Sequence, residues 1–520
     1  MYPLICGYNS SVYNTECNTN NKIAGFDFSD FINDNVRHSY HHNINVNLFG
    51  IKIPGCFFTH HMAHAASAYY LSGKRESAII TLDGGIDGLY CYAKENKIFP
   101  FTPNHLIVGS FYGKISEVDL KIDPGKMMGL APYGSDKFPI EDYVDKVLNF
   151  EGSCPVTYNN VINFNNTLIN YFIDQAKQKK INTKFLGDSE NILSEINVNI
   201  AHSTQKLAEK CILNGVNNLY SCMENMGIKT NNLCAAGGVF LNCPANSKII
   251  NESKFSNLFL PPMINDSGMS VGSSLALYHN VLDKPLNSNY KTSPQIAYHG
   301  LKRSFQEKSI ENALINYKKK ISIRKLSFNK ISKHAANDIK QNKVISLFYK
   351  GSESGPRALG HRSILANPTK SENWERVNKI KNRESWRPFA PACLESSINE
   401  YFKYNKNTDN LFYMLYNLKV KNDSLPAVTH VDGTSRVQSV NIDTGILFDI
   451  LQVLKKKTGL SAVLNTSFNG KSQPIIEDPS EAIEFLLNSD LDSLYLMNYK
   501  ITKKKPFFNF NTIIKIPKFL

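Results

Sequence analysis

The stretch FFTHHMAHAASAYY, Phe57–Tyr70, places three histidines beside a run of alanines. Alanine is the residue most willing to form a helix, so the run predicts one. On a helix, His60 and His64 stand four residues apart and share one face, whereas His61 points elsewhere. This is the spacing of a two-histidine metal clamp, and the stretch therefore predicts a helix that carries half of a metal site.

Two acids further along the chain are candidates for the remaining ligands. Asp83 follows SAIITL, which reads as a buried strand, and α/β proteins place ligand groups at the carboxyl ends of strands. Asp266 lies in PPMINDSGM, a polar loop before an expected helix. Two imidazoles and two carboxylates suit a borderline divalent ion such as iron, zinc or manganese. The histidine pair alone would favour simple core packing; with both acids present, a metal site is favoured.

Composition and charge narrow the class of protein. With 520 residues, 42% hydrophobic and 20% charged, the chain predicts at least two globular domains. It shows no secretory signal, no membrane-spanning run and no C-x-x-C pair among its ten cysteines, so we expect a cytoplasmic protein without a structural zinc site. A net charge of +14 favours anionic partners. The lysine triplets lie outside the motifs and no nucleic-acid module is recognisable, which favours small phosphorylated substrates.

Strand and helix patterns divide the chain into two parts. Residues 231–250 predict a strand, a Gly-Gly turn and a helix, and residues 155–218 predict mainly helix. After a lysine-rich stretch near residue 320, NKVISLFY and SAVLNTSFNG predict further strands. We therefore expect an α/β protein with a first part at 1–320 and a second at 321–520.

Glycine turns in the first part are candidates for nucleotide binding. Gly237 and Gly238 precede a helix, where backbone N–H groups suit phosphate, and Asn242 just beyond them suits a nucleoside. The segment DPGKMMGLAPYG joins Lys126 to a similar turn. Each signal is weak by itself, because most Gly-Gly pairs only form tight turns and most lysines are solvated.

The second part carries a denser set of cations and small polar groups in turns framed by glycine and proline. Arginine matches paired phosphate oxygens with two parallel N–H donors, which lysine cannot do. A structural ion-pair network explains any one arginine, but not why so many gather with few acids beside them. The candidates are Arg357, Arg362, Lys381, Arg387, Arg436, Asn465 and Ser467.

Taken together, these motifs resemble a known family. HHMAHAASAYY, LDGG, GKMMGLAPYG, AGGVFLN, GPRALGHRSILANP, RPFAP, HVDGTSRVQ and LNTSFNG, in this order, are similar to the carbamoyltransferase family of nodulation and antibiotic-tailoring enzymes. They run from His60 to about residue 476, and GPRALGHRSI with RPFAP is the most specific pair. The histidine motif is shared with wider relatives, namely the tRNA threonylcarbamoyl-transfer proteins and the hydrogenase-maturation carbamoyltransferase.

The resemblance implies a two-site enzyme. The first part would have the sugar-kinase/actin-like fold and the second a YrdC-like α/β fold. The second would make carbamoyladenylate from carbamoyl phosphate and ATP with Mg²⁺, and the first would pass the carbamoyl group to a hydroxyl of a small metabolite, sugar or natural product.

Position by position, the resemblance assigns roles to the candidates. His60, His64, Asp83 and Asp266 fall on metal ligands, usually for Fe(II), and Gly237, Gly238 and Asn242 on the nucleotide turn of the first part. Arg357, Lys381, Arg387 and Ser467 fall on contacts to carbamoyl phosphate and ATP, with Arg362, Arg436 and Asn465 less certain.

Several points stay open at this stage. An acceptor hydroxyl needs a base, and His64, His61 or a metal-bound hydroxide could serve. Transfer to a tRNA or protein acceptor, or a non-catalytic actin-like nucleotide-binding protein, are the alternatives. The segment before His60 is short and asparagine-rich for this family, which predicts an altered first sheet and acceptor pocket. A homodimer would be unsurprising.

Overall fold

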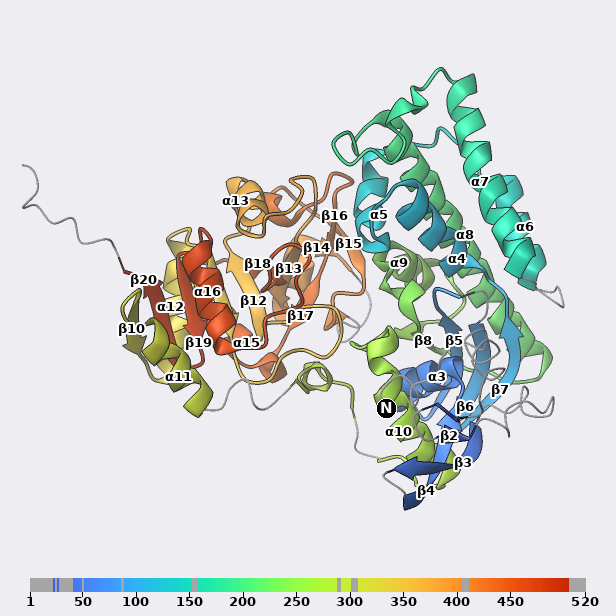
Figure 1. Ribbon diagram of the computed structural model, residues 1–520, viewed down its shortest axis with the longest axis horizontal. Coiled ribbons are helices and arrows are strands. Elements are labelled where there is room, and N and C mark those ends of the chain that lie inside the picture. The colour runs from blue at the N-terminus through green and yellow to red at the C-terminus, as the bar shows by residue number, and fades with distance from the viewer. Residues whose placement is uncertain are drawn as a thin grey trace, which may run out of the picture.

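The computed structural model describes residues 22–23, 26–27, 41–48, 51–85, 88–151, 158–287, 291–300, 307–404 and 411–504. The expectation for the segment before His60 falls mostly outside these ranges. Figure 1 shows two groups of elements side by side, one built from the blue-to-green half of the chain and one from the yellow-to-red half.

The central strand of the first part is formed by ESAIITL. Its β-branched and aliphatic residues suit a pleated, buried surface, and six of its seven residues are buried. This strand, β5, pairs antiparallel with β6 and parallel with β8. The sheet runs in the order β7-β6-β5-β8-β9, comprising β5 (Glu76–Leu82), β6 (Gly88–Lys94), β7 (Lys97–Asn104), β8 (Asn232–Ala236) and β9 (Asn257–Phe259).

A second, antiparallel sheet in the first part precedes the histidine helix. Its order is β1-β2-β3-β4, and the long hairpin of β3 and β4 leads directly into that helix. Its strands are β1 (Lys22–Ile23), β2 (Phe26–Asp27), β3 (His41–Leu48) and β4 (Ile51–Phe58).

The alanine run forms a helix as predicted, and the helix α3 (His60–Tyr70) is almost wholly buried. Small side chains allow close packing against α10 (Met269–Leu275), where a Cβ on Gly272 would lie 1.9 Å from the Ala63 carbonyl oxygen. The long helix α7 lies at the far side of this part from the second part (Figure 1). The remaining helices are α4 (Val108–Gly113), α5 (Pro124–Leu130), α6 (Glu141–Glu151), α7 (Tyr158–Gln178), α8 (Glu195–Asn225) and α9 (Cys243–Glu252).

The second part is built on an eight-stranded mixed sheet in the order β10-β20-β19-β11-β12-β18-β13-β17. The pairs β11–β19 and β13–β17 are parallel, and the other pairs are antiparallel. The strands are β10 (Ile321–Lys325), β11 (Ile345–Phe348), β12 (Arg362–Ala366), β13 (Ala390–Leu394), β17 (Gln438–Val440), β18 (Ala462–Ser467), β19 (Ser493–Leu496) and β20 (Tyr499–Lys503).

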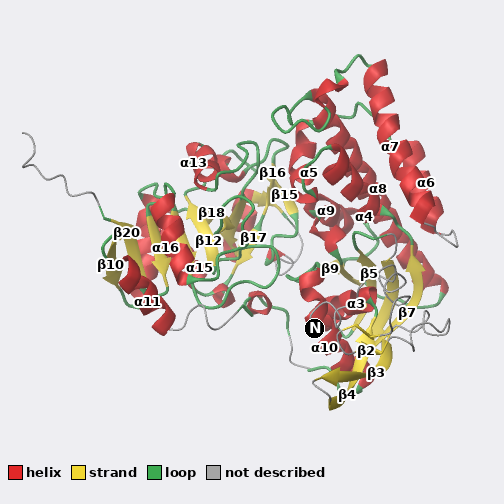
Figure 2. Ribbon diagram, in the orientation of Figure 1, coloured by secondary structure: helices red, strands yellow, loops and turns green. Residues whose placement is uncertain are grey.

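Helices cover this sheet, as Figure 2 shows in red against yellow. Apolar residues of α12 and α15 pack together with the sheet in one buried cluster. The helices are α11 (Glu307–Tyr317), α12 (Phe328–Lys340), α13 (Glu372–Ile380), α14 (Ile398–Tyr401), α15 (Ile446–Thr458) and α16 (Pro479–Asn488). A small antiparallel sheet completes the second part, with β14 (Phe402–Lys403), β15 (Asn417–Val420) and β16 (Thr434–Arg436).

Hydrogen bonds between side chains and backbone atoms join the two parts. The Asn246 amide of α9 donates to the Leu415 carbonyl at 2.9 Å, and Ser247 exchanges hydrogen bonds with Asn417. Gly355 has φ +103°, and a Cβ there would lie 2.2 Å from the Pro262 carbonyl oxygen, so only glycine allows this approach. These contacts hold the two parts against each other at α9 and at the loop that contains Gly355.

The predicted mixed α/β class is confirmed, with strands at SAIITL, NLCAA, ISLF and AVLNTS as expected. Every sheet draws its strands from one side of residue 320. However, α11 precedes that residue and bonds to α16 of the second part, through Tyr317 and Glu484. The boundary near residue 320 stays a prediction. Within the described ranges, none of the helices combines the length and the apolar character needed to cross a membrane.

Candidate active site

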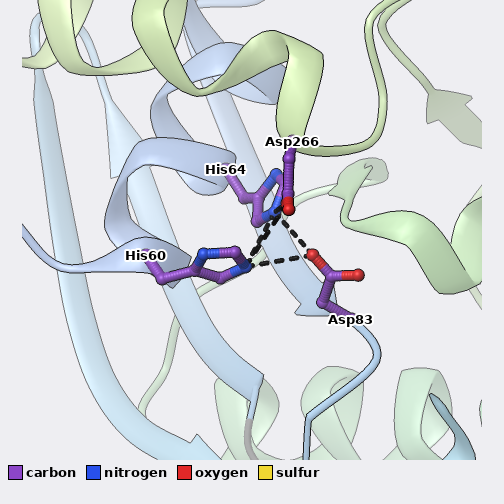
Figure 3. A group of neighbouring side chains, drawn as sticks. All are labelled: His60, His64, Asp83 and Asp266. Atoms are coloured by element: carbon purple, nitrogen blue, oxygen red, sulfur yellow. Dashed lines mark hydrogen bonds and ion pairs between the residues drawn. The ribbon is translucent and has the colours of Figure 1, made fainter. Parts of the chain in front are cut away.

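Four predicted metal ligands converge on one point (Figure 3). His60, His64, Asp83 and Asp266 each offer a ligand atom, and these atoms all lie within 4.8 Å of one another. The Nε2 atoms of both histidines lie 3.0 Å from Asp83 Oδ2 and 3.1 Å from each other. Asp266 Oδ1 lies 3.3 Å from His64 Nε2 and 3.7 Å from His60 Nε2.

These separations fit a shared ion. Ligand atoms about 2.1 Å from one metal lie roughly 3.0 Å apart at right angles and roughly 3.4 Å apart at the tetrahedral angle. His64 is fully buried, whereas Asp266 is 70% exposed, so the site opens to one side. Burial by itself would raise the pKa of Asp83, but its hydrogen bonds to His60 and His64 lower that pKa far more. The group is thus a preformed cluster of two imidazoles and two carboxylates.

The position of Asp83 depends on the Gly237-Gly238 turn. The backbone N–H groups of Gly84 and Gly238 donate to Asp83 Oδ1 at 2.8 and 3.0 Å, which leaves Oδ2 facing the histidines. Gly237 has φ +108°, and a Cβ there would lie 1.9 Å from the Leu82 carbonyl oxygen. Hydrogen bonds from neighbouring groups commonly orient metal ligands in this way.

This finding corrects the expected nucleotide role of the turn. The Gly237 N–H donates to the Ile264 carbonyl and the Gly238 N–H to Asp83, so neither is free for a phosphate. The Asn242 amide exchanges two hydrogen bonds with Gln205 and accepts the Ala245 N–H at the start of α9. The sequence suggested donors at this turn, but the tertiary structure uses them internally.

His61 lies beside the metal ligands without contributing a ligand atom. Its Nδ1 lies 2.9 Å from Thr81 Oγ1, and its ring packs edge-on against His60 with centroids 5.0 Å apart. The ring is 9% exposed. His61 is thereby positioned as a neighbour of the cluster rather than a member.

The predicted cations of the second part form a cluster. Burial, and then the charge of Arg436, lowers the pKa of Arg357 to about 10, with Arg387 adding to the effect. Burial, and then Arg383 and Arg387, holds the pKa of Lys381 well below its ordinary value. Such mutual depression requires closely spaced, desolvated like charges. This cation cluster consists of Arg357, Lys381, Arg383, Arg387 and Arg436.

Lys381 is anchored to LNTSFNG at the end of β18. Its Nζ donates to the Asn469 carbonyl at 2.9 Å, to Asn469 Oδ1 at 2.7 Å and to both oxygens of Ser467. Ser467 Oγ also donates to Asn469 Oδ1 at 2.7 Å. The predicted Lys381 and Ser467 are therefore brought together, and Asn469 joins them.

Unpaired polar atoms mark the cation cluster as a place for a ligand. The Nε atoms of Arg357 and Arg436 are buried without a hydrogen-bond partner within the described part of the chain. Leaving a charged donor unsatisfied in a buried position costs more than leaving a neutral one. The nearby acid Glu384 contacts Arg387 at 3.6 Å and Lys126 at 3.1 Å, so it neutralises only part of the charge.

Arg362 differs from Arg357 in its contacts. These contacts are structural and do not support the ligand-binding role that was expected for it. It is 0% exposed, and its guanidinium donates to the carbonyls of Ile476, Tyr349 and Lys350 at 2.9–3.1 Å. The same group lies over the Phe348 ring, 3.6 Å from its centroid. These contacts occupy the donors that a phosphate would need, so the geometry favours Arg357.

Two residues of the site were missed from the sequence. Arg383 joins the cation cluster and lies over the Phe389 ring at 4.1 Å, and Cys243 at the start of α9 lies within hydrogen-bonding reach of Arg357. Arg383 stands in the same KIKNRESWR segment as Lys381, and that proximity was a usable signal. Cys243 belongs to the first part, and nothing in the sequence indicates its neighbour.

Lys126 is found at the contact between the parts. It pairs with Glu384, and on the same side the Tyr133 hydroxyl donates to the Trp386 carbonyl at 3.0 Å. Both first-part residues belong to DPGKMMGLAPYG, and both second-part residues belong to RESWRP. The expected glycine-rich segment thus packs beside the cation cluster.

Comparison with known proteins identifies the class. Residues 27–275 match the family model "Carbamoyltransferase N-terminus", and residues 336–503 match "Carbamoyltransferase C-terminus". The chain belongs to the carbamoyltransferase family, and it is accordingly a transferase.

Individual relatives agree with this family. The chain is 31% identical to nodulation protein NolO of Bradyrhizobium diazoefficiens, over 86% of this chain and 79% of that protein. It is 31% identical to nodulation protein NolNO of Sinorhizobium fredii, over 86% and 64% respectively, so it spans less than two thirds of that relative. It is 29% identical to an uncharacterised protein of Synechocystis sp., over 86% and 76%.

A solved structure shares a partial likeness. The crystal structure of T. kodakarensis HypF is 16% identical, with a TM-score of 0.25, covering 35% of this chain and 23% of that one. A likeness this limited carries no argument about the fold.

Proposed function

We propose that this protein is an ATP-dependent O-carbamoyltransferase with two reaction sites. In the second part, carbamoyl phosphate, ATP and water give carbamoyladenylate, phosphate and pyrophosphate. In the first part, the carbamoyl group passes from the adenylate to a hydroxyl of a small metabolite, sugar or natural product, with release of AMP. The observation that carries the proposal is the half-buried cation cluster, in which Nε of Arg357 and of Arg436 is enclosed without a partner in the described part of the chain, joined with family membership.

The cation cluster suits the first reaction. Carbamoyl phosphate and ATP are both polyanions and repel each other, so fixed cations must offset that repulsion and stabilise charge developing in transfer. Arg357 and Arg436 supply unpaired buried donors, and Lys381 is held by Ser467 and Asn469. Mg²⁺ would accompany ATP, as it does for most nucleotide substrates. Lys381 and Arg387 are the proposed catalytic cations.

The histidine-aspartate group suits the second reaction. His60, His64, Asp83 and Asp266 would hold a divalent metal, for which Fe(II) is the proposal, and such an ion supplies Lewis-acid polarisation of a bound oxygen. His61 is held by Thr81 next to the four proposed ligands and is a candidate base for the acceptor hydroxyl. His64 serves as a ligand. The folds proposed for the two parts are sugar-kinase/actin-like and YrdC-like.

The face-to-face arrangement suits transfer between the sites. A mixed anhydride such as carbamoyladenylate is hydrolysed by water, so a protected route favours product. The contacts of α5 and α9 with the second part lie beside the cation cluster.

The proposal is tested by pyrophosphate release from ATP in the presence of carbamoyl phosphate. Arg387→Ala should lower the rate at least ~100-fold, because a donor to a developing charge is typically worth that much. Arg376→Ala is the matched control: Arg376 pairs with Asp492 at 2.6 Å, outside the cation cluster, and its variant should keep the wild-type rate.

Other outcomes decide between the alternatives. Undiminished pyrophosphate release by Arg387→Ala would refute the assignment of the cation cluster. A wild-type protein that binds ATP but releases no pyrophosphate would support the non-catalytic alternative. Carbamoylation of tRNA or protein, detected by mass spectrometry, would replace the small-molecule acceptor.

A further inference from the structure

Asn465 presents a buried acceptor close in the fold to residues that neighbour the cation cluster. Asn465 lies on β18 and is 1% exposed, and its Oδ1 is buried without a hydrogen-bond partner in the part of the chain that the structure describes. Buried amide oxygens in proteins nearly always accept a hydrogen bond. This unpaired acceptor therefore needs an explanation.

Hydrogen bonds to backbone carbonyls fix which atom of the Asn465 amide is the oxygen. Gln438 Nε2 donates to the Leu359 carbonyl at 2.8 Å, so Gln438 Oε1 is the acceptor on the other side. Asn465 Nδ2 donates to that Oε1 at 2.8 Å and to the Ala358 carbonyl at 3.2 Å. Reversing the Asn465 amide would set its oxygen against two oxygens, so the unpaired atom is the oxygen.

The residues around Asn465 adjoin members of the cation cluster in the chain or contact one. Ala358 follows Arg357, and Gln438 stands two residues after Arg436. Ser467 stands two residues further along β18, on the same face of the strand as Asn465, and bonds Lys381. The unpaired acceptor is thus adjacent to groups that the proposed function gives to carbamoyl phosphate.

The combination of unpaired donors and an unpaired acceptor defines the ligand more closely than the positive charge of the cluster does. A phosphate brings only acceptors, which satisfy the Nε donors of Arg357 and Arg436 but not an oxygen. A carbamoyl group brings an N–H donor together with a carbonyl acceptor. An acetyl group has the same shape but puts a methyl group where the amide nitrogen would be.

We propose that Asn465 Oδ1 accepts the N–H of the carbamoyl group and so selects carbamoyl phosphate against acyl phosphates that lack a donor. This inference rests on the proposed function and names its specificity residue. A site that leaves its own polar group unpaired with the wrong ligand rejects that ligand strongly, whereas shape alone separates near-isosteres poorly.

The experiment compares carbamoyl phosphate with acetyl phosphate. The readout is the kcat/KM for pyrophosphate release from ATP with each compound, measured on the full-length protein. The wild-type should prefer carbamoyl phosphate by ~100-fold or more. Asn465→Leu removes the acceptor, and the preference should fall to within roughly threefold because neither ligand then leaves a protein oxygen unpaired.

A matched control variant tests whether Asn465 selects the ligand or only supports the local structure. Gln438→Met removes the partner of Asn465 Nδ2 but leaves Oδ1 in place. It should slow both substrates by similar factors and keep the preference. If Asn465→Leu slows both substrates equally and keeps the wild-type preference, the inference is overturned and Asn465 is only structural.

Asn465→Ala serves if the leucine variant does not fold. Alanine also removes the acceptor, so the preference for carbamoyl phosphate should again fall, and its survival at the wild-type level would overturn the inference. Failure of the proposed function looks different: the wild-type would then release no pyrophosphate with carbamoyl phosphate at all.

Discussion

His60 and His61 are neighbours in the chain but lie in different surroundings. His60 Nε2 faces Asp83, Asp266 and His64, whereas His61 bonds Thr81. We expect His60→Ala to lose the proposed metal, because it removes one of four candidate ligands from a site that is open to water at Asp266. Metal content of the purified protein, measured by mass spectrometry, checks this. His61→Gln is the control and should retain the metal.

Full metal occupancy in His60→Ala would contradict the metal assignment. Treating the wild-type with a chelator, then removing the chelator and assaying with Mg²⁺, should abolish carbamoyl transfer and leave pyrophosphate release intact, because the cation cluster contains none of the four proposed ligands. Loss of both activities together would indicate that the two sites are not separate.

Arg357 and Arg362 are five residues apart and make opposite contributions to stability. Arg362 holds several backbone carbonyls, so Arg362→Leu should lower the free energy of unfolding by about 3 kcal/mol or more, since it orphans buried acceptors. Arg357 is half-buried, its Nε atom is enclosed without a partner among the described residues, and its charge is repelled by Arg436, so Arg357→Leu should leave stability unchanged or raised while pyrophosphate release is lost. Chemical denaturation and the enzymatic rate together check both variants.

The helix α12 is held to the second part's sheet through one buried acid. Burial alone would raise the pKa of Asp338, but hydrogen bonds from Lys500, Tyr495 and Lys343 lower it further than burial raises it. Because the folded pKa is depressed below the ordinary 3.8, this contribution to stability is complete above about that pH and is lost as the pH falls through the folded value.

The resulting prediction concerns the acid side of the stability profile. Asp338→Asn should destabilise the protein at pH 7 by about 2 kcal/mol, since it removes the charge partner of two lysines at a buried position. The difference from the wild-type should shrink when thermal unfolding is measured at progressively lower pH, below about 3.8. A difference that stays constant down to strongly acidic pH would rule out this role for the ionised carboxylate.

Elements with a strong local pattern were predictable. The alanine run forms α3, and SAIITL, ISLF and AVLNTS form strands β5, β11 and β18, because their periodicity and β-branched content act within a few residues. The pairing of these strands was not predictable in this way. For example, β5 lies beside β8, about 150 residues away in the chain, through long-range contacts.

At the scale of the whole molecule, the two parts meet beside the cation cluster. Lys126 of α5 pairs with Glu384, beside Arg387 of the cation cluster. Lys126→Ala removes a partly buried ion pair of about 1 kcal/mol. We expect free carbamoyladenylate in solution to rise about fivefold relative to pyrophosphate, because the contact proposed to shield this intermediate opens more often. Mass spectrometry of quenched reactions measures these products.

Lys137→Ala is the control for this prediction. Lys137 pairs with Glu195 on the surface of the first part, and its loss should not change the ratio. An unchanged ratio in Lys126→Ala would show that this ion pair does not protect the intermediate.

The residue types of both sites follow from the sequence, because imidazole, carboxylate and guanidinium carry their chemistry wherever they lie. Family membership follows from the same motifs and agrees with the relatives. The convergence of His60, His64, Asp83 and Asp266 was expected from helix spacing and strand ends. The shared face of His60 and His64 depends on neighbours a few residues away, whereas Asp83 and Asp266 join them through the tertiary fold.

Only the tertiary structure decided which polar groups stay available to a ligand. The sequence could not separate Arg357 from Arg362, and it predicted free donors at Gly237 and Gly238 where Ile264 and Asp83 already accept them. It likewise offered no reason to place Cys243 beside Arg357. Whether a donor is free depends on partners tens to hundreds of residues distant, and those partners are set by packing rather than by local pattern.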